Sequence, residues 1–266
     1  MRIARFRHGA RTRYGIVEGN EVAEVRGSIF GRSQPTGSRY PLGEVKLLAP
    51  VVPSQMFGPG LNFAEHLAHA SGITGQTRMA ETPNPWHKGV NALIGPEDTI
   101  VIPYDSQAGI QYEGECLAVI GRRARRVSSE EGWACILGYT CGNDVSERGW
   151  QRADRSFWRA KAADTFSPIG PWIETEFDPR RGSYMVVRLN GREVQRANTR
   201  DMHFDFGTLV SYISQWVTLK PGDIIWSGTT GAPENMNRGD VVEVDVEGVG
   251  VLRNRVGEER RPRSRP

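Results

Sequence analysis

The chain has 266 residues, of which 38% are hydrophobic and 24% are charged, and its formal net charge is +3. This length allows one large domain with a sizeable core, alone or beside a small second domain. The composition is that of a soluble globular protein, and the weak positive charge is too small to indicate nucleic-acid binding by itself.

The cysteines and the hydropathy of the sequence indicate where in the cell we expect the protein to be. Cys116, Cys135 and Cys141 form no CxxC pair, so we expect neither a disulfide framework nor a zinc site, and we expect a cytoplasmic location. The charged start, MRIARFRHGARTRYG, is unlike a signal peptide. Because no apolar run approaches the roughly 18 residues of a membrane-spanning helix, no membrane partner is expected.

Arginines gather in two places, residues 122–126 and the tail EERRPRSRP. We interpret the first as a solvated loop, and we predict that residues 258–266 form a disordered basic tail. The alternative is a nucleic-acid-binding surface. It is the weaker interpretation, because no aromatic residues are interleaved with the arginines and no recognition-helix pattern is present.

Residues 1–48 are predicted to form a small N-terminal β domain. The segments RIARFRH, RYGIVEG and EVAEVRG alternate hydrophobic and polar residues and are broken by glycines, as short antiparallel strands are. A turn-rich connector, GSIFGRSQPTGSRYPLGE, follows them.

Residues 49–257 are predicted to form a larger β-rich domain. Its strand candidates are TIVIP, ECLAVIG, PWIETEF, MVVRLNG, DIIWSG and DVVEVDVEGVGVLRN. The helical patterns are NFAEHLAHAS, FGTLVSYISQWV, and SSEEGWACILGYT with a capping signal at Ser128 or Ser129. Strands outnumber helices and do not alternate with them. The sequence therefore predicts a mainly β fold with some α, built from mixed or antiparallel strands.

Two carboxylates stand two residues apart in IQYEGECLAVIG, at Glu113 and Glu115. On a strand they share one face, about 7 Å apart at the backbone, where like charges repel unless a cation or a proton intervenes. Asp144, beside the turn that Gly142 permits, offers a third oxygen ligand of the kind that hard divalent cations prefer. The alternative is that the pair lines a solvated face, since E-x-E is common on strands.

Five blocks of the sequence closely resemble the fumarylacetoacetate hydrolase family. They are GPGLNFAEH, YEGECLAVIGRRARRVSSEEGWACILGYTCGNDVSERGWQ, KAADTFSPIGPW, NGREVQRANTRDM and LKPGDIIWSGT, in order between about Ser54 and Val256. The first 48 residues resemble the short β extension of some bacterial members. The resemblance implies a β-roll-like core of largely antiparallel strands and a homodimer. It also implies one Mg²⁺ or Mn²⁺ per subunit, held by Glu113, Glu115 and Asp144.

Members of this family act on 2-oxo acids or 1,3-dicarbonyl acids, so the resemblance implies a metal-dependent enzyme. A 2-oxo carboxylate can chelate the cation, which then stabilises the enolate formed as a neighbouring bond breaks or a proton leaves. The same chemistry serves hydrolysis of acylpyruvates, decarboxylation of oxaloacetate-type acids and isomerisation in aromatic catabolism, and the fold does not choose among them. We place C–C hydrolysis or decarboxylation first. An isomerase or tautomerase of an unsaturated 2-oxo diacid comes second, and a non-catalytic metal or ligand binder third.

The resemblance also marks residues near the substrate. Lys161 matches a lysine beside the metal, where its ammonium could bind a carboxylate or an enolate oxygen as a point charge. Arg148 and Gln151 match substrate contacts, and Gln195 and Thr229 match polar substrate-binding positions. Gln195 has an alternative role as a support of the fold.

The expected catalytic base departs from the family pattern. Small members carry H-x-x-E on a short helix of a mobile lid, whereas NFAEHLAHASG has His66 at the histidine position and His69 in place of the glutamate. Both rings share one helix face, but a second histidine orients an imidazolium poorly. Glu65 and Glu81 are candidates for the missing carboxylate. We predict catalytic roles for His66, His69 and Lys161, with two exposed helix histidines as the alternative.

This departure favours decarboxylation or proton transfer over water activation. The segment after the histidines is predicted to be a lid that orders over the substrate, with Gly72 and Gly75 as hinges. Trp86 and Lys88 match a family block directly after it.

Overall fold

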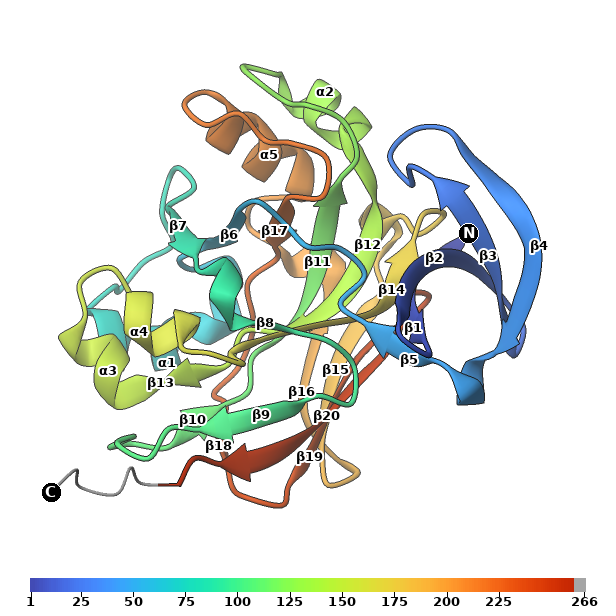
Figure 1. Cartoon of the computed structure of the whole chain (residues 1–266). Helices are drawn as coiled ribbons and strands as arrows, with labels where there is room; N and C mark the ends of the chain where they lie inside the picture. Colours follow the sequence, from blue (N-terminus) through green and yellow to red (C-terminus); the bar gives the residue numbers. More distant parts are fainter. Residues whose placement is uncertain (261–266) are drawn as a thin grey trace, which may run out of the picture.

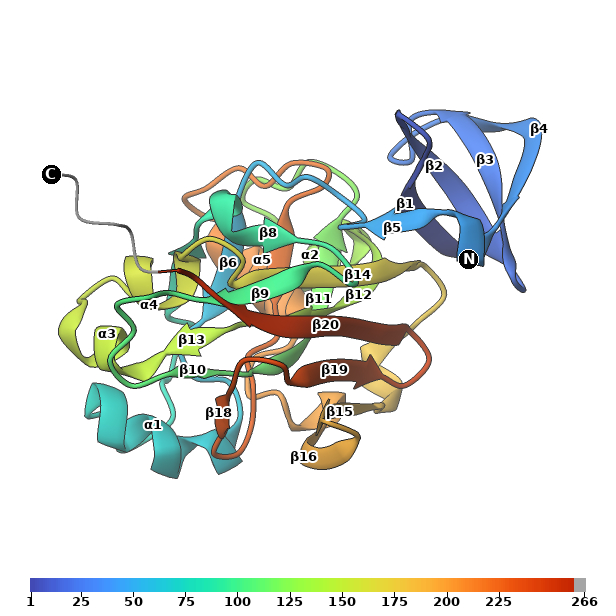
Figure 2. The ribbon, with the colours of Figure 1, turned by 60° about the horizontal axis from the view of Figure 1, so that its bottom comes forward.

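A computed structural model of the chain describes residues 1–260. Figure 1 shows a small N-terminal β unit beside a larger core, and Figure 2 shows the same unit standing at one side of the core. The strands of the N-terminal unit are β1 (Arg2–His8), β2 (Arg11–Glu18), β3 (Glu21–Gly27), β4 (Ser33–Pro41) and β5 (Lys46–Leu48).

The core is built mainly of strands, with short helices at its edges. Its strands are β6 (Met56–Pro59), β7 (Pro85–Lys88), β8 (Leu93–Ile94), β9 (Thr99–Ile102), β10 (Ile110–Gln111), β11 (Gly114–Ile120), β12 (Ile136–Asn143), β13 (Ser146–Glu147), β14 (Ser167–Glu174), β15 (Tyr184–Leu189), β16 (Arg192–Asn198), β17 (Ile224–Trp226), β18 (Asn235–Met236), β19 (Val241–Val246) and β20 (Gly250–Glu258). Its α-helices are α1 (Leu67–Thr74), α2 (Ser129–Ala134), α3 (Arg148–Ala153), α4 (Trp158–Ala162) and α5 (Phe206–Ser214). Short 3₁₀ turns are η1 (Leu42–Glu44), η2 (Ala64–His66), η3 (Val90–Ala92), η4 (Pro179–Arg181) and η5 (Thr199–Asp201).

One large sheet runs through both parts of the molecule in the order β4-β3-β2-β1-β14-β12-β11-β17-β6-β7. The N-terminal unit joins the core where β1 pairs antiparallel with β14, Arg2 opposite Glu174 and Ile3 opposite Ile173. A second sheet, in the order β16-β15-β19-β20-β9, packs against the first, and a small third sheet contains β13, β10 and β18. The mainly β class with mixed and antiparallel strands is confirmed.

Strand β11 lies at the centre of the core and is buried on both faces. Cys116, Ala118 and Ile120 pack into one hydrophobic cluster, and Leu117 and Val119 pack into another. A strand covered on both sides needs apolar residues at every position. This explains the unbroken run CLAVI that follows the two glutamates.

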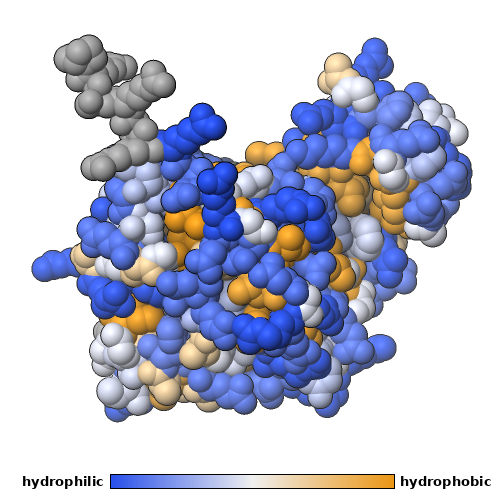
Figure 3. Space-filling view, turned by 90° about the horizontal axis from the view of Figure 1, so that it is seen from below, coloured by the Kyte–Doolittle hydropathy of each residue, from blue (hydrophilic) through white to orange (hydrophobic). Residues whose placement is uncertain are grey.

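A groove lies between the N-terminal unit and the core, beyond the strand pair that joins them. Its lining includes Leu42, Leu47, Trp172 and Val251. Figure 3 shows hydrophobic side chains on the surfaces that face this hollow. The two parts share the β1–β14 junction, and beside it Ile16 and Phe30 of the N-terminal unit pack against a hydrophobic cluster of the core.

The predicted helix in SSEEGWACILGYT is correct only for its first half. Ser128 caps α2, since its side chain accepts a hydrogen bond from the Glu131 N–H while the Glu131 carboxylate accepts one from the Ser128 N–H. The helix ends at Ala134, and Ile136–Asn143 forms strand β12. The second half was wrong because pairing with β11 and β14 on both edges outweighs the helical spacing of its apolar residues.

The arginine-rich loop, the cysteines and the absence of a membrane span can also be compared with the structure. The guanidinium of Arg122 donates to the Ala134 carbonyl at the end of α2, and that of Arg125 donates to the Ser214 carbonyl at the end of α5. These two arginines thus tie the loop to helix ends and are not simply solvated. The three cysteines are free and buried. Among residues 1–260, no helix is long and apolar enough to cross a membrane.

The predicted C-terminal tail can be placed only at its beginning. Strand β20 runs through Glu258, which pairs with Ile102 of β9. The rest of the predicted tail, from residue 261, lies outside the described residues, so its disorder stays a prediction.

Gly138 of β12 has no room for a side chain, and this generates a stability prediction. A Cβ there would lie 2.5 Å from the Glu174 backbone oxygen and 2.8 Å from the Ile173 side chain, both in β14. We expect Gly138→Ala to lower the free energy of unfolding by about 1–3 kcal/mol in urea titrations, because β12 and β14 must move apart. Gly43→Ala, at a position with no neighbouring atom within 4 Å, is the control. Equal unfolding midpoints for the two variants would contradict this packing.

Candidate functional site

Three carboxylates converge where strands β11 and β12 come together. Glu113 directly precedes β11, Glu115 is its second residue, and Asp144 directly follows β12. The strands are paired antiparallel with Glu115 opposite Gly142, and the Asp144 N–H donates to the Glu113 carbonyl over 2.8 Å. One oxygen of each carboxylate lies within 4.8 Å of the others. The structure therefore brings together the three residues predicted to hold a metal.

The carboxylates are buried, and cationic side chains pair with two of them. Their exposed fractions are 2% for Glu113, 2% for Glu115 and 3% for Asp144. The Lys161 Nζ lies 2.6 Å from Glu113 Oε2 and 2.5 Å from Asp144 Oδ2, so it bridges the two. Arg148 Nη2 contacts the other Glu113 oxygen, and Lys88 Nζ lies 2.6 Å from the other Asp144 oxygen.

Within residues 1–260, Glu115 has no cationic side chain paired with it. Its carboxylate accepts the Gly228 N–H over 2.7 Å. Burial, reinforced by the negative charges of Asp144 and Glu113, raises the pKa of Glu115 well above its ordinary value. Burial also acts to raise the pKa of Glu113, but the charges of Arg148 and Lys161 outweigh it, and that pKa falls below its ordinary range. An added positive charge in this cluster would thus be most favourable next to Glu115.

The two lysines are held differently. Burial acts to lower the pKa of Lys161, but the charges of Asp144 and Glu113 outweigh it and raise that pKa. For Lys88, burial dominates the attraction of Asp144 and lowers the pKa. Both ammonium groups lie over the Trp86 ring, at 5.5 Å for Lys88 and 5.3 Å for Lys161, a geometry that stabilises a desolvated cation.

Short helices α3 and α4 deliver the cationic side chains. α3 begins after Glu147, whose carboxylate accepts the Trp150 N–H and so caps the helix. Arg159 of α4 lies over the Trp150 ring at 4.8 Å, which joins the two helices. Within α3, Arg148 donates to the Gln151 side chain over 2.6 Å. Neither helix was predicted, since each has six residues or fewer and too little sequence for periodicity to show.

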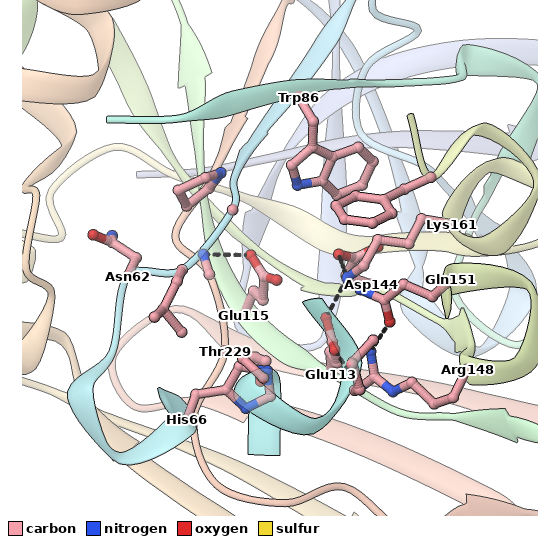
Figure 4. A pocket seen from close by; sticks show the side chains of 17 residues that line it. Asn62, His66, Trp86, Glu113, Glu115, Asp144, Arg148, Gln151, Lys161 and Thr229 are labelled. Carbon is pink, nitrogen blue, oxygen red and sulfur yellow. Dashed lines mark hydrogen bonds and ion pairs between the residues drawn. The ribbon is translucent and has the colours of Figure 1, made fainter. Parts of the chain in front are cut away.

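These side chains surround one cavity, whose lining is both charged and apolar (Figure 4). Of the predicted site residues, those that line it are His66, Glu113, Glu115, Asp144, Arg148, Gln151, Lys161 and Thr229. The apolar part of the lining comes from Leu61, Ala70, Ile73, Trp86 and Phe157. Ala70 and Ile73 belong to α1, so the predicted lid helix forms part of the cavity wall.

Two predicted site residues do not line the cavity. Gln195 lies behind it, where its side chain donates to Thr229 Oγ1 over 2.8 Å and to the Gly114 carbonyl over 3.1 Å. This contact fits the alternative role of Gln195 as a support. His69 lies on α1 with its ring centroid 5.3 Å from that of His66, and its buried Nε2 has no hydrogen-bond partner among residues 1–260.

His66 is oriented by a backbone carbonyl. Its Nδ1 lies 2.6 Å from the Gly231 oxygen, and because a carbonyl can only accept, Nδ1 carries the proton and Nε2 keeps its lone pair. Burial lowers the pKa of His66, which favours this neutral form. Of the two candidate carboxylates, Glu65 accepts a hydrogen bond from the Thr230 hydroxyl over 3.1 Å, while Glu81 is exposed and lies outside the cavity lining.

One of the two predicted hinges, Gly75, marks the end of α1. Gly75 ends α1 in a left-handed conformation with φ of 76°, a value that glycine adopts without strain. Gly72 lies inside α1 and continues the helix. The segment after α1 is held in part by His203, whose Nε2 lies 2.9 Å from the Ala80 carbonyl oxygen.

The donor set fits a hard divalent cation. Three carboxylates offer oxygen ligands at close range, and Glu115 lacks a compensating cation among residues 1–260. Oxygen-rich sites of this kind suit Mg²⁺ or Mn²⁺. A cation that took oxygens from both Glu113 and Asp144 would compete with the ammonium of Lys161.

Sequence reasoning marked Lys88 only as part of a matching block and missed its contact with Asp144. It also missed the Gly231 carbonyl and Gln111, whose side-chain oxygen accepts from Arg148 Nε over 2.7 Å. Lys88 is the last residue of β7. A fully buried lysine is rare and would indicate a functional role, but the sequence does not show that Lys88 is buried. A backbone carbonyl leaves no signal in the sequence at all.

Comparisons with known proteins cover most of the chain. Residues 55–257 match the family model "Fumarylacetoacetate (FAA) hydrolase C-terminal", and residues 1–50 match "Rv2993c-like, N-terminal". The mitochondrial oxaloacetate tautomerase FAHD2A of Bos taurus is 34% identical over 255 residues, which cover 91% of this chain and 79% of the relative.

Two solved structures illustrate the range of reactions among similar folds. The 5-carboxymethyl-2-hydroxymuconate delta-isomerase of Mycobacterium smegmatis matches with a TM-score of 0.89 at 36% identity, covering 97% of this chain and 100% of that chain. The maleylpyruvate hydrolase of Sphingobium sp. SYK-6, in complex with manganese(II) and pyruvate, matches with a TM-score of 0.79 at 28% identity, covering 98% of this chain and 100% of that chain. The resemblance stated from the sequence blocks is therefore confirmed.

The unpaired carboxylate of Glu115 predicts opposite effects of Glu115→Gln on metal binding and on stability. We expect Mn²⁺ affinity, measured by calorimetry, to fall roughly 100-fold or more because one ligand oxygen loses its charge. When folding raises the pKa of a carboxyl group, the folded state loses stability as the pH rises from the pKa of the unfolded chain toward the pKa of the folded protein. Chelator-treated wild type should therefore lose stability over that rise, and Glu115→Gln should lose less.

The control for this prediction is Glu44→Gln, at an exposed glutamate. It should leave both Mn²⁺ affinity and the pH dependence of unfolding as in wild type. Unchanged metal affinity in Glu115→Gln would show that Glu115 is not a ligand.

The bridging position of Lys161 predicts that it competes with a metal ion. In the absence of substrate, Lys161→Met should bind Mn²⁺ more tightly than wild type, roughly tenfold for each 1.4 kcal/mol of repulsion removed. Calorimetry or the electron-spin-resonance signal of free Mn²⁺ would measure this. Lys46→Met, which removes an exposed lysine paired with Asp98, is the control, and weaker binding by Lys161→Met would contradict the competition.

Proposed function

The chain belongs to the fumarylacetoacetate (FAA) hydrolase family, and we propose that it is a divalent-metal-dependent enzyme of a small 2-oxo acid or 1,3-dicarbonyl acid. The proposed reaction is transfer of a proton at the carbon next to the 2-oxo group, a tautomerisation or isomerisation. The observation that carries the proposal is the buried cluster of Glu113, Glu115 and Asp144, which faces one cavity together with Lys161 and His66.

Glu113, Glu115 and Asp144 would hold Mg²⁺ or Mn²⁺, one ion per subunit. When bound, the ion would act as a Lewis acid on the keto and carboxylate oxygens of the substrate. The similar hydrolase that carries manganese(II) and pyruvate supports a divalent ion together with a 2-oxo acid.

The charges of the cavity favour an anionic substrate. The three cations of Lys88, Lys161 and Arg148 balance the formal charge of the three carboxylates, although all three pair with Glu113 or Asp144. A divalent ion would leave an excess of positive charge, which a carboxylate substrate offsets. Lys161 and Arg148 would bind the carboxylate, and the Thr229 hydroxyl offers a further donor at the cavity wall.

His66 is suited to accept and return a single proton. Its Nδ1–H is fixed by the Gly231 carbonyl, which leaves the Nε2 lone pair available at the cavity. Among residues 1–260, no carboxylate is hydrogen-bonded to this ring. A protonated His66 would therefore lack the negative partner that stabilises an imidazolium while an activated water attacks. Relatives named as an oxaloacetate tautomerase and a delta-isomerase support the same class of reaction.

A second candidate is C–C hydrolysis of an acylpyruvate or decarboxylation of an oxaloacetate-type acid. The similar maleylpyruvate hydrolase favours it, and decarboxylation makes little demand on a base. A non-catalytic ligand binder remains the third candidate. A homodimer and a cytoplasmic location accompany the proposal as expectations.

The test is an assay of metal-stripped protein with Mg²⁺ or Mn²⁺ added back. The substrates are oxaloacetate, acetylpyruvate and fumarylpyruvate. Enol absorbance, solvent deuterium at carbon 3, CO₂ and the cleavage products are followed against a sample without enzyme. We expect metal-dependent enol–keto interconversion and deuterium exchange without CO₂ or cleavage. His66→Gln should lower this rate roughly 100-fold or more.

Other results would count against the proposal in distinct ways. Metal-dependent CO₂ release would identify a decarboxylase, and cleavage of the diketones would identify a hydrolase. If the metal binds but none of the three acids reacts, the enzyme proposal fails and the ligand binder takes its place.

A further inference from the structure

Residues 228–231 form a short loop that touches both the acidic cluster and the lid. The Gly228 N–H donates to Glu115, and Thr229 Oγ1 accepts from Gln195. The next two residues turn the other way, since the Thr230 hydroxyl donates to Glu65 and the Gly231 carbonyl accepts from His66. One stretch of four residues thus contacts a candidate metal ligand at one end and the base at the other.

Two glycines shape the backbone of this loop. Gly228 and Gly231 have φ of +81° and +67°, values that favour glycine. A Cβ on Gly228 would lie 2.9 Å from the Asn62 side chain, so the loop packs directly against the segment that leads into η2. Its two hydrogen bonds to η2 therefore come from a loop that packs against the chain beside that element.

The contacts with the lid fall on adjacent residues. Glu65 and His66 are the last two residues of η2, and α1 follows directly. The Glu65 carboxylate is exposed, whereas the Thr230 side chain that it accepts from is 2% exposed. Ala70 and Ile73, one and two turns further on, line the cavity with His66. The position of η2 against the loop thus sets where the His66 ring and the α1 wall lie.

We propose that Glu65 and Thr230 form a latch that positions His66 over the cavity, taking the orienting role that His69 cannot fill. His69 Nε2 makes no hydrogen bond within residues 1–260, so His69 does not fix the His66 ring. The Gly231 carbonyl can fix the Nδ1 proton only while η2 stays against the loop. The inference rests on the proposed role of His66 as a proton acceptor, and Glu65 and Thr230 are positioning residues.

The test compares disruptive with conservative variants at both ends of the latch. Glu65→Ala and Thr230→Val remove the hydrogen bond, whereas Glu65→Gln keeps an acceptor and Thr230→Ser keeps the hydroxyl. Glu81→Ala is the matched control, because it removes an exposed carboxylate that follows α1. Amide hydrogen exchange of residues 66–74 and the ¹⁵N shifts of the His66 ring report the latch without any substrate.

The disruptive variants should speed exchange of these amides roughly tenfold, the factor expected for one lost hydrogen bond. They should also shift the His66 ring toward a mixture of tautomers. Their kcat for the metal-dependent reaction should fall by a similar factor, with KM and Mn²⁺ affinity within about twofold of wild type. The double variant should be no worse than either single one. Glu65→Gln, Thr230→Ser and Glu81→Ala should behave as wild type.

Unchanged exchange and ring shifts in both disruptive variants would overturn the latch. An equal effect of Glu81→Ala, or equal losses in the conservative variants, would also overturn it, since the hydrogen bond would then not be the cause. If exchange rises while kcat of an active enzyme is unchanged, the positioning role is wrong. A protein that turns over none of the acids refutes the proposed function alone, because the exchange and ring measurements still decide the latch.

Discussion

Mutual neutralisation of buried charges is the constraint on which the rest of the site depends. Glu113 and Asp144 lie at the ends of two paired strands that are buried in the core. A desolvated carboxylate is stable only with a close partner, so the chain must bring cations to it from elsewhere. Lys88 comes from β7, Arg148 from α3 and Lys161 from α4. The short helices and the edge strand are thus held by the charges they deliver as much as by apolar packing.

The incompleteness of this neutralisation gives the site its chemistry. In the part of the chain that the structure describes, Glu115 pairs with a backbone N–H and with no cation, and its pKa is raised by burial and by its two acidic neighbours. Lys161 meanwhile occupies the space between Glu113 and Asp144. The ammonium of Lys161 thus offsets the charge of two of the three carboxylates, whereas Glu115 is left for an added cation. The same lysine is then close to any anion that enters the cavity.

The sequence predicted the acidic cluster because strand periodicity and the end of a buried segment are local signals. Glu113, Glu115 and Asp144 could be named from E-x-E and from the turn after CILGYT, and the matching family blocks added Lys161 and Arg148. The contacts that lie far apart in the chain were not predictable in this way. Lys88 meets Asp144 across 56 positions, and His66 meets the Gly231 carbonyl across 165. The helix expected over residues 128–140 failed for a related reason, since its second half pairs with strands distant in sequence.

The replacement of a glutamate by His69 looked, in the sequence, like the loss of a catalytic partner. In the structure, a backbone carbonyl orients the His66 ring, which is one of the tasks of the glutamate in the family pattern. A carbonyl oxygen at Gly231 fixes one tautomer of His66, but unlike a carboxylate it brings no negative charge to stabilise an imidazolium. A base held in this way can pass a proton and be restored at once, which suits interconversion of an enol and a ketone. It is poorly suited to holding the proton while water attacks a carbon–carbon bond. Under the proposed function, the oxygen that faces Nδ1 therefore favours proton transfer by His66 over water activation.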